Sequence, residues 1–445
     1  MKKLVSGLLA ITVVSSSALT AVACGNNKSF NEIFLITDAG RVSDKSFNES
    51  GKNAGDKFIK EISEVNKDGA YSGIGFNEPP NVSEIPHGYG KAKVAGAKVA
   101  ILPGFHHSGE NLKIASDTLG EDSTEIIIDG EPEGLSNVIG LLYKADMSGF
   151  YAGMASIYQT IKDGKQINNK VVLATFGGQS NYYAVELFMV GFLAAIDVYN
   201  QIRNEEGNNL LDSIFEETEY KKIEAKMAQS SWPENESDKN WYSGSFMAGD
   251  GKTISEALLT LNPNVIMPVA GPQTADLLGV IKQKNAQDSI KVVGVDTNQA
   301  EAYSNSYSNY FITSAEKNIV DSTLVAIASS KQYYNNETVL KNIKTYYEEN
   351  NLSMTLDDGK DVKDLLGTKD IMGKTIWTPG DISKDGNNIL KSDDATKIKN
   401  AFKVEYLKEA SNNYFNNINK YDASKLLDAT KEYSDLIIKS INKQK

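Results

Sequence analysis

Three aspartates and one glycine stand at the ends of short hydrophobic segments that have the composition of buried β-strands. Asp38, Asp129 and Asp296 follow three of these segments, and Gly271 follows a fourth. Ligands of open α/β sheets bind beyond the carboxyl ends of the strands, so these residues should converge on one region. Carboxylates there can accept both hydroxyl hydrogen bonds of a cis-diol and hold a sugar or a ribose without a covalent step. The alternative, in which each aspartate caps the next helix, explains a single case more readily than three.

The residue types needed for metal-dependent or nucleophilic chemistry are scarce. The chain has three histidines, at positions 87, 106 and 107, and one cysteine, so it lacks the ligand spacing of a zinc site. It has no G-x-S-x-G nucleophile elbow, and Gly251-Lys252-Thr253 lacks the first glycine of a P-loop. We therefore expect a protein that binds a ligand without catalysis and without a metal or another cofactor.

One enzyme class stays open as an alternative. Asp38, Asp44 and Asp129 suggest the acidic cluster of a calcium-dependent nucleoside hydrolase. Such a cluster would have to follow the first strand closely, and Arg41 places a cation where the metal ion would lie. The hydrolase is therefore the less favoured interpretation.

The predicted strands alternate with helical patterns, which is the signature of βα units and a parallel sheet. They are short and rich in Ile, Val and Leu, as expected for strands that helices cover on both faces. The predicted strands are residues 33–37, 99–102, 125–128, 138–142, 171–175, 265–269 and 290–295. Helical periodicity predicts helices over residues 47–62, 184–199 and 426–437, whereas prolines and glycines between residues 69 and 97 favour a loop or a short helix.

Composition narrows the class further. A chain of 445 residues exceeds the usual size of one domain, which predicts two lobes or more. Acidic residues outnumber basic ones by 58 to 46, and the net charge of −12 argues against nucleic acid as a partner. With a single cysteine the fold has no internal disulfide and depends on packing.

The N-terminus reads as a bacterial lipoprotein signal. Basic residues and an apolar stretch lead through Ala21-Val22-Ala23 to Cys24, a run that resembles a lipobox. We expect residues 1–23 to be removed and Cys24 to be acylated, with palmitate among its chains. Residues 24–30 would then tether the protein to the outer face of the cell membrane. A transmembrane helix is the competing interpretation, but serines at positions 15–17 interrupt the apolar stretch.

A series of short motifs follows in a distinctive order from about residue 33 to residue 321. They are Thr37-Asp38-Ala39-Gly40, Asp44-Lys45-Ser46-Phe47-Asn48, Pro103-Gly104-Phe105, Ile128-Asp129-Gly130, Gly177-Gly178, Gly191-Phe192, Gly244-Ser245-Phe246, Gly251-Lys252, Val295-Asp296-Thr297 and Thr313-Ser314-Ala315-Glu316-Lys317. Together they resemble the basic membrane protein family of lipoproteins, whose best-known type is the purine nucleoside receptor. The ordered set is more specific than any one motif in it.

The resemblance implies both a fold and a role. Members of the family have the type I periplasmic-binding-protein fold, in which hinge strands join two α/β lobes around a ligand cleft. They are capture subunits of ABC importers, so the implied partners are a nucleoside, a permease and its ATPase, and the implied state is a monomer. We place the N-terminal lobe at residues 31–150 with part of 296–330, and the C-terminal lobe at residues 151–295 with about 331–445.

The same resemblance implies a set of ligand-binding residues. In the family, two phenylalanines stack on the purine base, and the matching residues here are Phe47 and Phe246. Acidic residues at the positions of Asp129 and Asp296 hold the ribose. Stacking on an aromatic ring is worth about 1–3 kcal/mol per base and tolerates different bases. The full set of matching pocket positions is Asp38, Phe47, Asp129, Phe246, Gly271, Asp296 and Lys317.

Two departures from the family pattern leave the ligand open. Ala39 stands at a position that is polar in the purine receptor, and Gly177-Gly178 is followed by Gln179-Ser180, where a more apolar sequence is expected. The base is therefore undetermined. A sugar-binding receptor, or a surface lipoprotein outside transport, is the alternative on the same fold.

Overall fold

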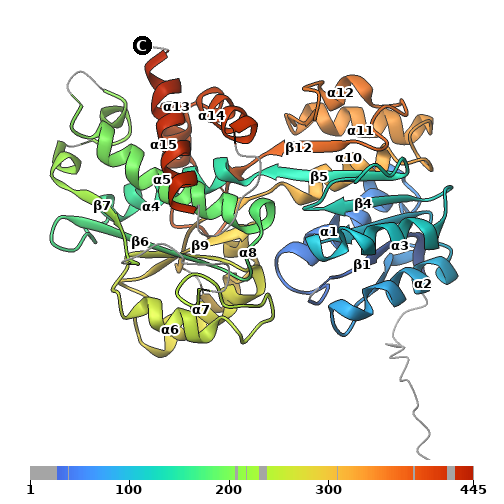
Figure 1. The fold of residues 1–445 in the computed structure, drawn as a ribbon, viewed down its shortest axis with the longest axis horizontal. Helices are drawn as coiled ribbons and strands as arrows, with labels where there is room; N and C mark the ends of the chain where they lie inside the picture. Colours follow the sequence, from blue (N-terminus) through green and yellow to red (C-terminus); the bar gives the residue numbers. More distant parts are fainter. Residues whose placement is uncertain are drawn as a thin grey trace, which may run out of the picture.

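The structure is a computed structural model, and it describes residues 28–38, 40–205, 209–216, 218–229, 238–307, 309–383, 386–417 and 426–443. Two lobes lie side by side, each built on a mostly parallel sheet with helices on both faces (Figure 1). The α/β architecture predicted from alternating strands and helices is therefore confirmed. The predicted signal peptide 1–23, the predicted lipidation site Cys24 and the departure at Ala39 lie outside the described residues.

The first lobe contains a seven-stranded sheet in the order β11-β12-β5-β4-β3-β1-β2. Its strands are β1 (Lys28–Ile36), β2 (Tyr71–Asn77), β3 (Val99–Pro103), β4 (Thr124–Ile128), β5 (Val138–Lys144), β11 (Thr355–Leu356) and β12 (Thr375–Pro379). Neighbouring strands pair in parallel, except that β11 and β12 are antiparallel.

Alternate residues of these strands point to opposite layers of helices. Ile33 and Leu35 pack in a layer with α1 (Phe47–Lys57), α10 (Ile319–Ala328), α11 (Glu337–Glu349) and α12 (Val362–Leu365). Phe34 and Ile36 pack on the other face with α2 (Ile85–Ala95) and α3 (Glu110–Leu119). The near-continuous apolar strands of the sequence therefore reflect a sheet that is covered on both faces.

The second lobe contains a six-stranded sheet in the order β13-β10-β9-β8-β6-β7. Its strands are β6 (Lys170–Gly177), β7 (Glu224–Met227), β8 (Val265–Val269), β9 (Lys291–Asp296), β10 (Phe311–Glu316) and β13 (Asp381–Ile382), of which β13 is antiparallel to β10. One face packs against α6 (Lys252–Leu259), α7 (Thr274–Gln283) and α8 (Gln299–Ala302), and α9 (Ser304–Tyr307) follows α8. The other face packs against α4 (Ala145–Lys162), α5 (Leu187–Ile202), α13 (Ser392–Ala401), α14 (Val404–Asn417) and α15 (Leu426–Lys443).

Short 3₁₀ or π-helical turns connect the main elements. They lie at Phe58–Ile62, Val82–Glu84, Phe105–His107, Tyr182–Glu186, Leu211–Ser213, Thr218–Lys222 and Gly271–Gln273. The turn at Phe58–Ile62 continues α1, so the helix predicted over residues 47–62 is confirmed with a π-helical end. The turn at Tyr182–Glu186 leads into α5 and begins the helix predicted over residues 184–199.

Three segments of the described chain pass between the lobes: from β5 to α4, from β10 to α10, and from β12 to β13. The first and third of them touch, because a Cβ added at Gly380 would lie 2.6 Å from the carbonyl oxygen of Lys144. Adjacent crossing segments of this kind form a hinge about which two lobes can rotate.

The lobe boundaries differ from the predicted ones. Residues 331–379 were predicted in the C-terminal lobe, but β12 extends the first sheet, with Thr375 beside Gly140 and Pro379 beside Lys144. Part of residues 296–330 was predicted in the N-terminal lobe, and α10 does pack there, whereas β10 pairs with β9 in the second sheet. The second lobe also starts earlier than residue 151, because α4 begins at Ala145. Pairing between strands that are far apart in the sequence determines which lobe each segment joins. Local sequence patterns do not reveal this pairing.

Two local predictions were also wrong. Residues 69–97 hold β2 and the 11-residue helix α2, where a loop or a short helix was predicted. Pro86 lies in the first turn of α2, where its missing N–H is not needed, and Gly88 lets the helix approach Ile36, 2.6 Å from where a Cβ would lie. Residues 28–30, predicted as the end of the tether, are the first residues of β1.

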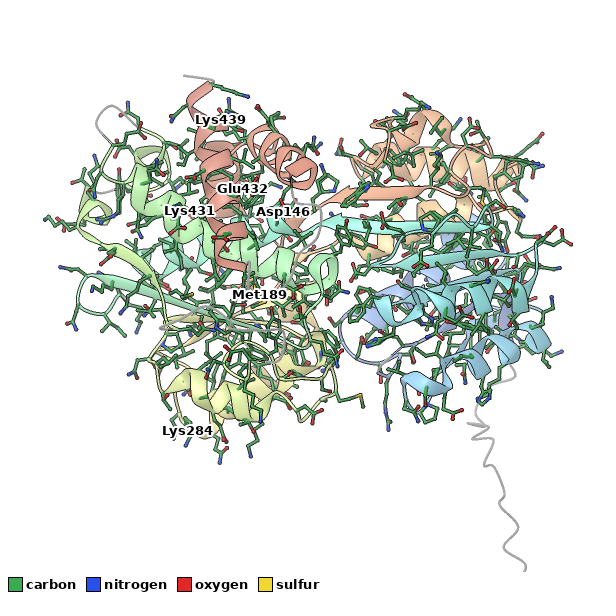
Figure 2. The ribbon with its side chains drawn as sticks, viewed as in Figure 1. Asp146, Met189, Lys284, Lys431, Glu432 and Lys439 are labelled. Atoms are coloured by element: carbon green, nitrogen blue, oxygen red, sulfur yellow. The ribbon has the colours of Figure 1, made fainter. Side chains whose placement is uncertain are left out.

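The most apolar helix of the second lobe lies in its core. Among the described residues, one helix, Tyr183–Ile202, is long and apolar enough to cross a membrane, and 83% of its most apolar stretch is buried inside the protein. It packs along α4 on one side and α15 on another. Figure 2 shows the buried Met189 and Asp146 close to the lower part of α15, whose Lys431 and Lys439 are exposed. The C-terminal helix predicted through residues 426–437 is therefore confirmed, and it covers this core.

Candidate functional site

A cavity lies between the two lobes, beyond the carboxyl ends of β1, β4, β8 and β9. It encloses about 530 Å³ of space, part of it open to solvent. Every residue predicted for the ligand pocket lines it: Asp38, Phe47, Asp129, Phe246, Gly271, Asp296 and Lys317. The structure thus brings the predicted residues of both lobes together, and their role in binding stays a prediction.

The two aspartates that follow β4 and end β9 adopt a backbone conformation that few residues tolerate. Asp129 and Asp296 have φ angles of 62° and 67°, in the left-handed region that Asp enters more readily than most side chains. Neither residue caps a helix, because β5 is the next element after Asp129, and Asn298 caps α8 by accepting from Glu301 N. The capping alternative is therefore wrong for both aspartates.

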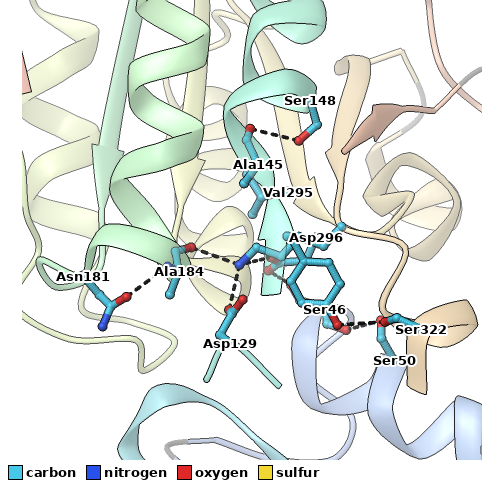
Figure 3. A network of polar contacts seen from close by, with 12 residues as sticks. Ser46, Ser50, Asp129, Ala145, Ser148, Asn181, Ala184, Val295, Asp296 and Ser322 are labelled. Carbon is cyan, nitrogen blue, oxygen red and sulfur yellow. Dashed lines mark hydrogen bonds and ion pairs between the residues drawn. The ribbon is translucent and has the colours of Figure 1, made fainter. Parts of the chain in front are cut away.

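Lys317 ties the aspartates of the two lobes together. Its Nζ donates to Asp129 Oδ2 at 2.7 Å and to the carbonyl oxygen of Ala184 at 3.1 Å. It also lies 3.6 Å from Asp296 Oδ1, and Figure 3 shows Asp129, Ala184 and Asp296 in this network. Lys317 is only 1% exposed, so its charge must be balanced by these carboxylates. Lys317 lies in the segment between β10 and α10 that crosses from one lobe to the other, so these ion pairs are at the hinge.

One oxygen of Asp129 has no partner among the described residues. Asp129 is 5% exposed, its Oδ2 accepts from Lys317, and its buried Oδ1 accepts no hydrogen bond from this part of the chain. Burial raises the pKa of Asp129 to about 6; Lys317 opposes this rise, and the carboxylates of Asp296 and Asp38 add to it. A buried acceptor without a donor is costly, so Oδ1 is well placed to accept a hydrogen bond from a ligand.

Phe47 and Phe246 line the cavity from opposite lobes and are both partly exposed. Phe246 meets Phe105 edge to face, with ring centroids 5.8 Å apart. It also packs on Gly178, where a Cβ would lie 2.5 Å from two of its ring carbons. The glycine thus allows the ring to approach the backbone. An aromatic ring on each side of the cavity suits a flat ligand.

The turn that begins α1 is built around Asp44. Its carboxylate accepts from the backbone N–H groups of Ser46 at 2.9 Å, Asn48 at 2.9 Å and Glu49 at 3.1 Å, so it caps the start of the helix. Burial raises the pKa of Asp44 to about 6, and these hydrogen bonds oppose the rise. Asn48 donates its Nδ2 to Asp44 Oδ2 at 3.0 Å, whereas its buried Oδ1 accepts no hydrogen bond from the described residues. Asn48 also lines the cavity.

Sequence reasoning missed Phe105 and His106. The Nδ1 of His106 pairs with Asp38 Oδ2 at 2.8 Å, and the two missed rings stack with centroids 4.4 Å apart. Gly104 makes room for this arrangement: its φ is 109°, and a Cβ there would lie 1.9 Å from Asp38 Oδ2. The available signal was the motif Pro103-Gly104-Phe105 at the end of a predicted strand.

The acidic residues of the cavity do not form a metal site. In the part of the chain that the structure describes, no group of three or more His, Cys, Asp and Glu side chains is arranged to hold a metal ion. Asp38 instead pairs with His106, and Asp129 pairs with Lys317. The calcium cluster of a nucleoside hydrolase therefore has no counterpart among the described residues.

Comparison with known proteins gives one related sequence and a set of related folds. No family model matches the sequence. An uncharacterized lipoprotein of Mycoplasma genitalium is 23% identical over 356 residues, which cover 66% of this chain and 60% of that relative. The match thus spans less than two thirds of the relative's length.

Among solved structures, the chain is similar to an ABC transporter solute-binding protein of Aeropyrum pernix K1. The TM-score is 0.54 at 16% identity, and the match covers 93% of this chain and 91% of that one. An ABC transporter solute-binding protein of Mycobacterium smegmatis with bound glycerol matches with a TM-score of 0.43 and 13% identity, over 69% of this chain and 88% of that one.

The fold is that of the solute-binding proteins of ABC transporters. The similarity to the Aeropyrum protein extends over nearly the whole of both chains. This chain has two mostly parallel sheets flanked by helices. The predicted two-lobed periplasmic-binding-protein fold is thereby confirmed.

Proposed function

We propose that this protein is a lipid-anchored solute-binding protein that captures nucleosides between its lobes and delivers them to an ABC permease and its ATPase. The observation that carries the proposal is the buried, unpartnered Oδ1 of Asp129, in a cavity lined by Phe47 and Phe246. A nucleoside joins a flat base to a ribose with hydroxyl donors, and the cavity offers a partner to each part. The protein performs no chemistry on its ligand.

In the proposed complex the base lies between the rings of Phe47 and Phe246. Each ring contributes about 1–3 kcal/mol by stacking and accepts different bases. The ribose hydroxyls donate to Asp129 and Asp296. The positive charge of Lys317 reduces the repulsion between these two carboxylates, because its Nζ lies 2.7 Å from Asp129 Oδ2 and 3.6 Å from Asp296 Oδ1. These directional bonds fix the orientation of a ligand that stacking alone would leave free to slide.

The charge of the cavity favours a neutral ligand. Asp38, Asp44, Asp129 and Asp296 line it, and Lys317 stands against them. A phosphate group would bring further negative charge close to these carboxylates in a partly buried site, where repulsion is stronger than in water. We therefore propose that nucleosides bind and nucleotides do not.

A sugar is the second candidate ligand. The pair formed by His106 and Asp38, with 2.8 Å between Nδ1 and Oδ2, adds polar groups that sugar hydroxyls can use. The ring of Phe246 can also stack on the apolar face of a sugar. A sugar needs no stacking partner at Phe47. Phe47→Ala should therefore weaken the binding of a nucleoside much more than the binding of a sugar.

Isothermal titration of the purified full chain with inosine, guanosine, uridine, ribose, glucose and inosine monophosphate tests the proposal. We expect the nucleosides to bind and the Asp296→Ala variant to lose most of this binding, while Asp358→Ala, at an exposed aspartate of the other lobe, behaves as the parent. A chain that binds none of the nucleosides would sink the proposal. Binding of glucose alone would favour the sugar candidate, and release of ribose from inosine would favour the hydrolase.

The anchor is tested separately. The Mycoplasma relative is named a lipoprotein, and this chain has the lipobox-like run before Cys24. We expect Cys24→Ser to move the protein from the membrane fraction to the soluble fraction and to abolish palmitate labelling. Retention in the membrane without Cys24 would contradict acylation as the anchor.

A further inference from the structure

The first turn of α1, in the first lobe, reaches into the second lobe beside Gly271. Ser46 Oγ donates to Asp296 Oδ2 at 2.9 Å, and Figure 3 shows both residues in the network around the cavity. The Nε2 of Gln299 lies 3.4 Å from the carbonyl oxygen of Lys45. These contacts join the lobes beside the cavity, next to Lys317, whose Nζ lies 3.6 Å from the other oxygen of Asp296.

Gly271 is the position at which the lobes approach most tightly in this contact. A Cβ there would lie 2.1 Å from Ser46 Oγ and 2.6 Å from Ser46 Cβ, far inside van der Waals contact. From its own lobe the nearest atom would be Asp296 Oδ2 at 3.4 Å, which is an ordinary contact. The φ of Gly271 is not in the left-handed region, so its backbone accepts alanine. The missing side chain thus serves the approach of the other lobe and not the fold of its own.

We infer that Ser46 and Gly271 form a latch that sets how far the two lobes close, and that Gly271 is a positioning residue for ligand capture. In the latched arrangement Asp296 Oδ2 accepts a hydrogen bond from Ser46 Oγ, while Asp296 Oδ1 lies 3.6 Å from Lys317 Nζ. Closure therefore fixes the orientation of a carboxylate that the proposed function uses for the ribose. The effect on affinity rests on the proposed function, whereas the effect on closure does not.

An alanine at position 271 keeps the lobes apart for a steric reason. The Oγ of Ser46 can rotate away from the new methyl group, but the Cβ of Ser46 cannot, because it is attached to the backbone of the residue that immediately precedes α1. The population of the closed state falls, and the apparent affinity falls with it. A glycine at position 46 removes both clashing atoms and also the hydrogen bond from Ser46 Oγ to Asp296, so the double variant tests the steric stop alone. It costs α1 no cap, because the Ser46 side chain makes no capping hydrogen bond.

A distance measurement between the lobes tests the latch. The full chain with Cys24→Ser receives spin labels at Val94→Cys in the first lobe and Leu261→Cys in the second, whose native side chains are 91% and 44% exposed. Distance distributions are recorded with and without inosine, and inosine affinity and the thermal unfolding midpoint are measured in parallel.

We expect the labelled parent to populate a short interlobe distance and Gly271→Ala to lose that population, with its unfolding midpoint unchanged. Its affinity for inosine should fall by about tenfold or more. The double variant Ser46→Gly, Gly271→Ala should regain the short distance, which a merely structural role for Gly271 would not predict. The matched control is Gly279→Ala on α7 of the same lobe, where a Cβ meets nothing within 4 Å.

Three results would overturn the latch. They are a parent that never populates the short distance, a Gly271→Ala variant with the distances of the parent, and a loss of closure that Ser46→Gly does not restore. If the distances respond as expected but no nucleoside binds, the proposed function fails and the latch stands.

Discussion

At the scale of single residues, Asp129 makes ligand binding depend on pH. Burial raises its pKa to about 6, and a ligand hydroxyl needs the deprotonated carboxylate as its acceptor. Binding therefore weakens as the pH falls through that value. We expect the affinity for inosine to fall by about tenfold between roughly pH 7 and pH 5, and the Asp129→Asn variant to bind weakly with little dependence on pH. Titration calorimetry over this interval measures both.

The same carboxyl group acts on stability with the opposite sign. Its pKa is raised from 3.8 when unfolded to about 6 when folded, so the folded chain holds this proton more tightly. Burial also raises the pKa of Asp44 to about 6, so Asp44 affects stability in the same direction. The stability from both groups is complete below their unfolded pKa and is lost as the pH rises through about 6. Without ligand, we expect these two groups to lower the free energy of unfolding as the pH rises from about 4 to above 6. Urea unfolding at fixed ionic strength measures it, and Asp44→Asn and Asp129→Asn should each flatten the slope.

The sequence predicted residues of this cavity better than it predicted their contacts. Asp129 and Asp296 could be found because they follow apolar strands, and strand ends of a parallel sheet lie at one edge. The pairing of His106 with Asp38 could not, because it joins the ends of two strands that are distant in the chain. Asn48 was part of a recognised motif, yet only the structure shows that its Oδ1 is buried and has no partner among the residues that the structure describes.

At the scale of elements, glycines determine how closely α4 and α5 pack. A Cβ at Gly191 would lie 2.0 Å from the carbonyl oxygen of Asp146 and 2.8 Å from the backbone nitrogen of Phe150. Gly191→Ala must push the two helices apart, and we expect it to lower the free energy of unfolding by about 1–3 kcal/mol or more. Urea unfolding measures the loss.

Gly279→Ala is the control for this substitution. It also places an alanine in a helix of the second lobe, but its Cβ meets open space. Alanine favours a helix over glycine by up to about 1 kcal/mol, so this variant should be as stable as the parent or slightly more stable. Equal destabilisation by both substitutions would show that helix packing is not the cause.

Elements with continuous periodicity were predictable, and those held by tertiary contacts were not. The apolar run of α5 and the closing pattern of α15 each identify a helix within the sequence itself. The helix α2 escaped prediction because Pro86, Gly88 and Gly90 weaken its local signal. Contact with the sheet supports it instead, since Gly88 lies against Ile36 and Tyr89 is fully buried.

At the scale of the whole molecule, the C-terminal helices belong to the core of the second lobe. Ile437 of α15 is fully buried in the cluster that contains α4 and α5. We expect Ile437→Ala to cost about 2–5 kcal/mol and to speed amide hydrogen exchange in the second lobe, with the first sheet unchanged. Lys439→Ala, at an exposed position of the same helix, is the control. Equal acceleration in both lobes would contradict this and show that they open as one unit.

The two-lobed architecture was predictable from the sequence, but the route of the chain through it was not. Alternating strands and helices specify βα layers wherever they occur. Which sheet a late strand joins depends on partners far away, as for β12, which pairs with β5. The prediction therefore failed at residues 331–379, where short strands and polar helices carry no mark of their sheet.

The return of the chain to the first lobe constrains the order of folding. The sheet of the first lobe cannot be completed until β12 has been synthesised. β12 pairs with β5, with Thr375 opposite Gly140, and β11 pairs with the other edge of β12 through Leu356. Most of the second lobe is made in the interval and can form its own sheet first. Long-range pairing of this kind slows folding, since a large loop must close before the contacts form. A ribosome that stalls before β12 would thus leave β5 as an open edge, ready to pair with another chain.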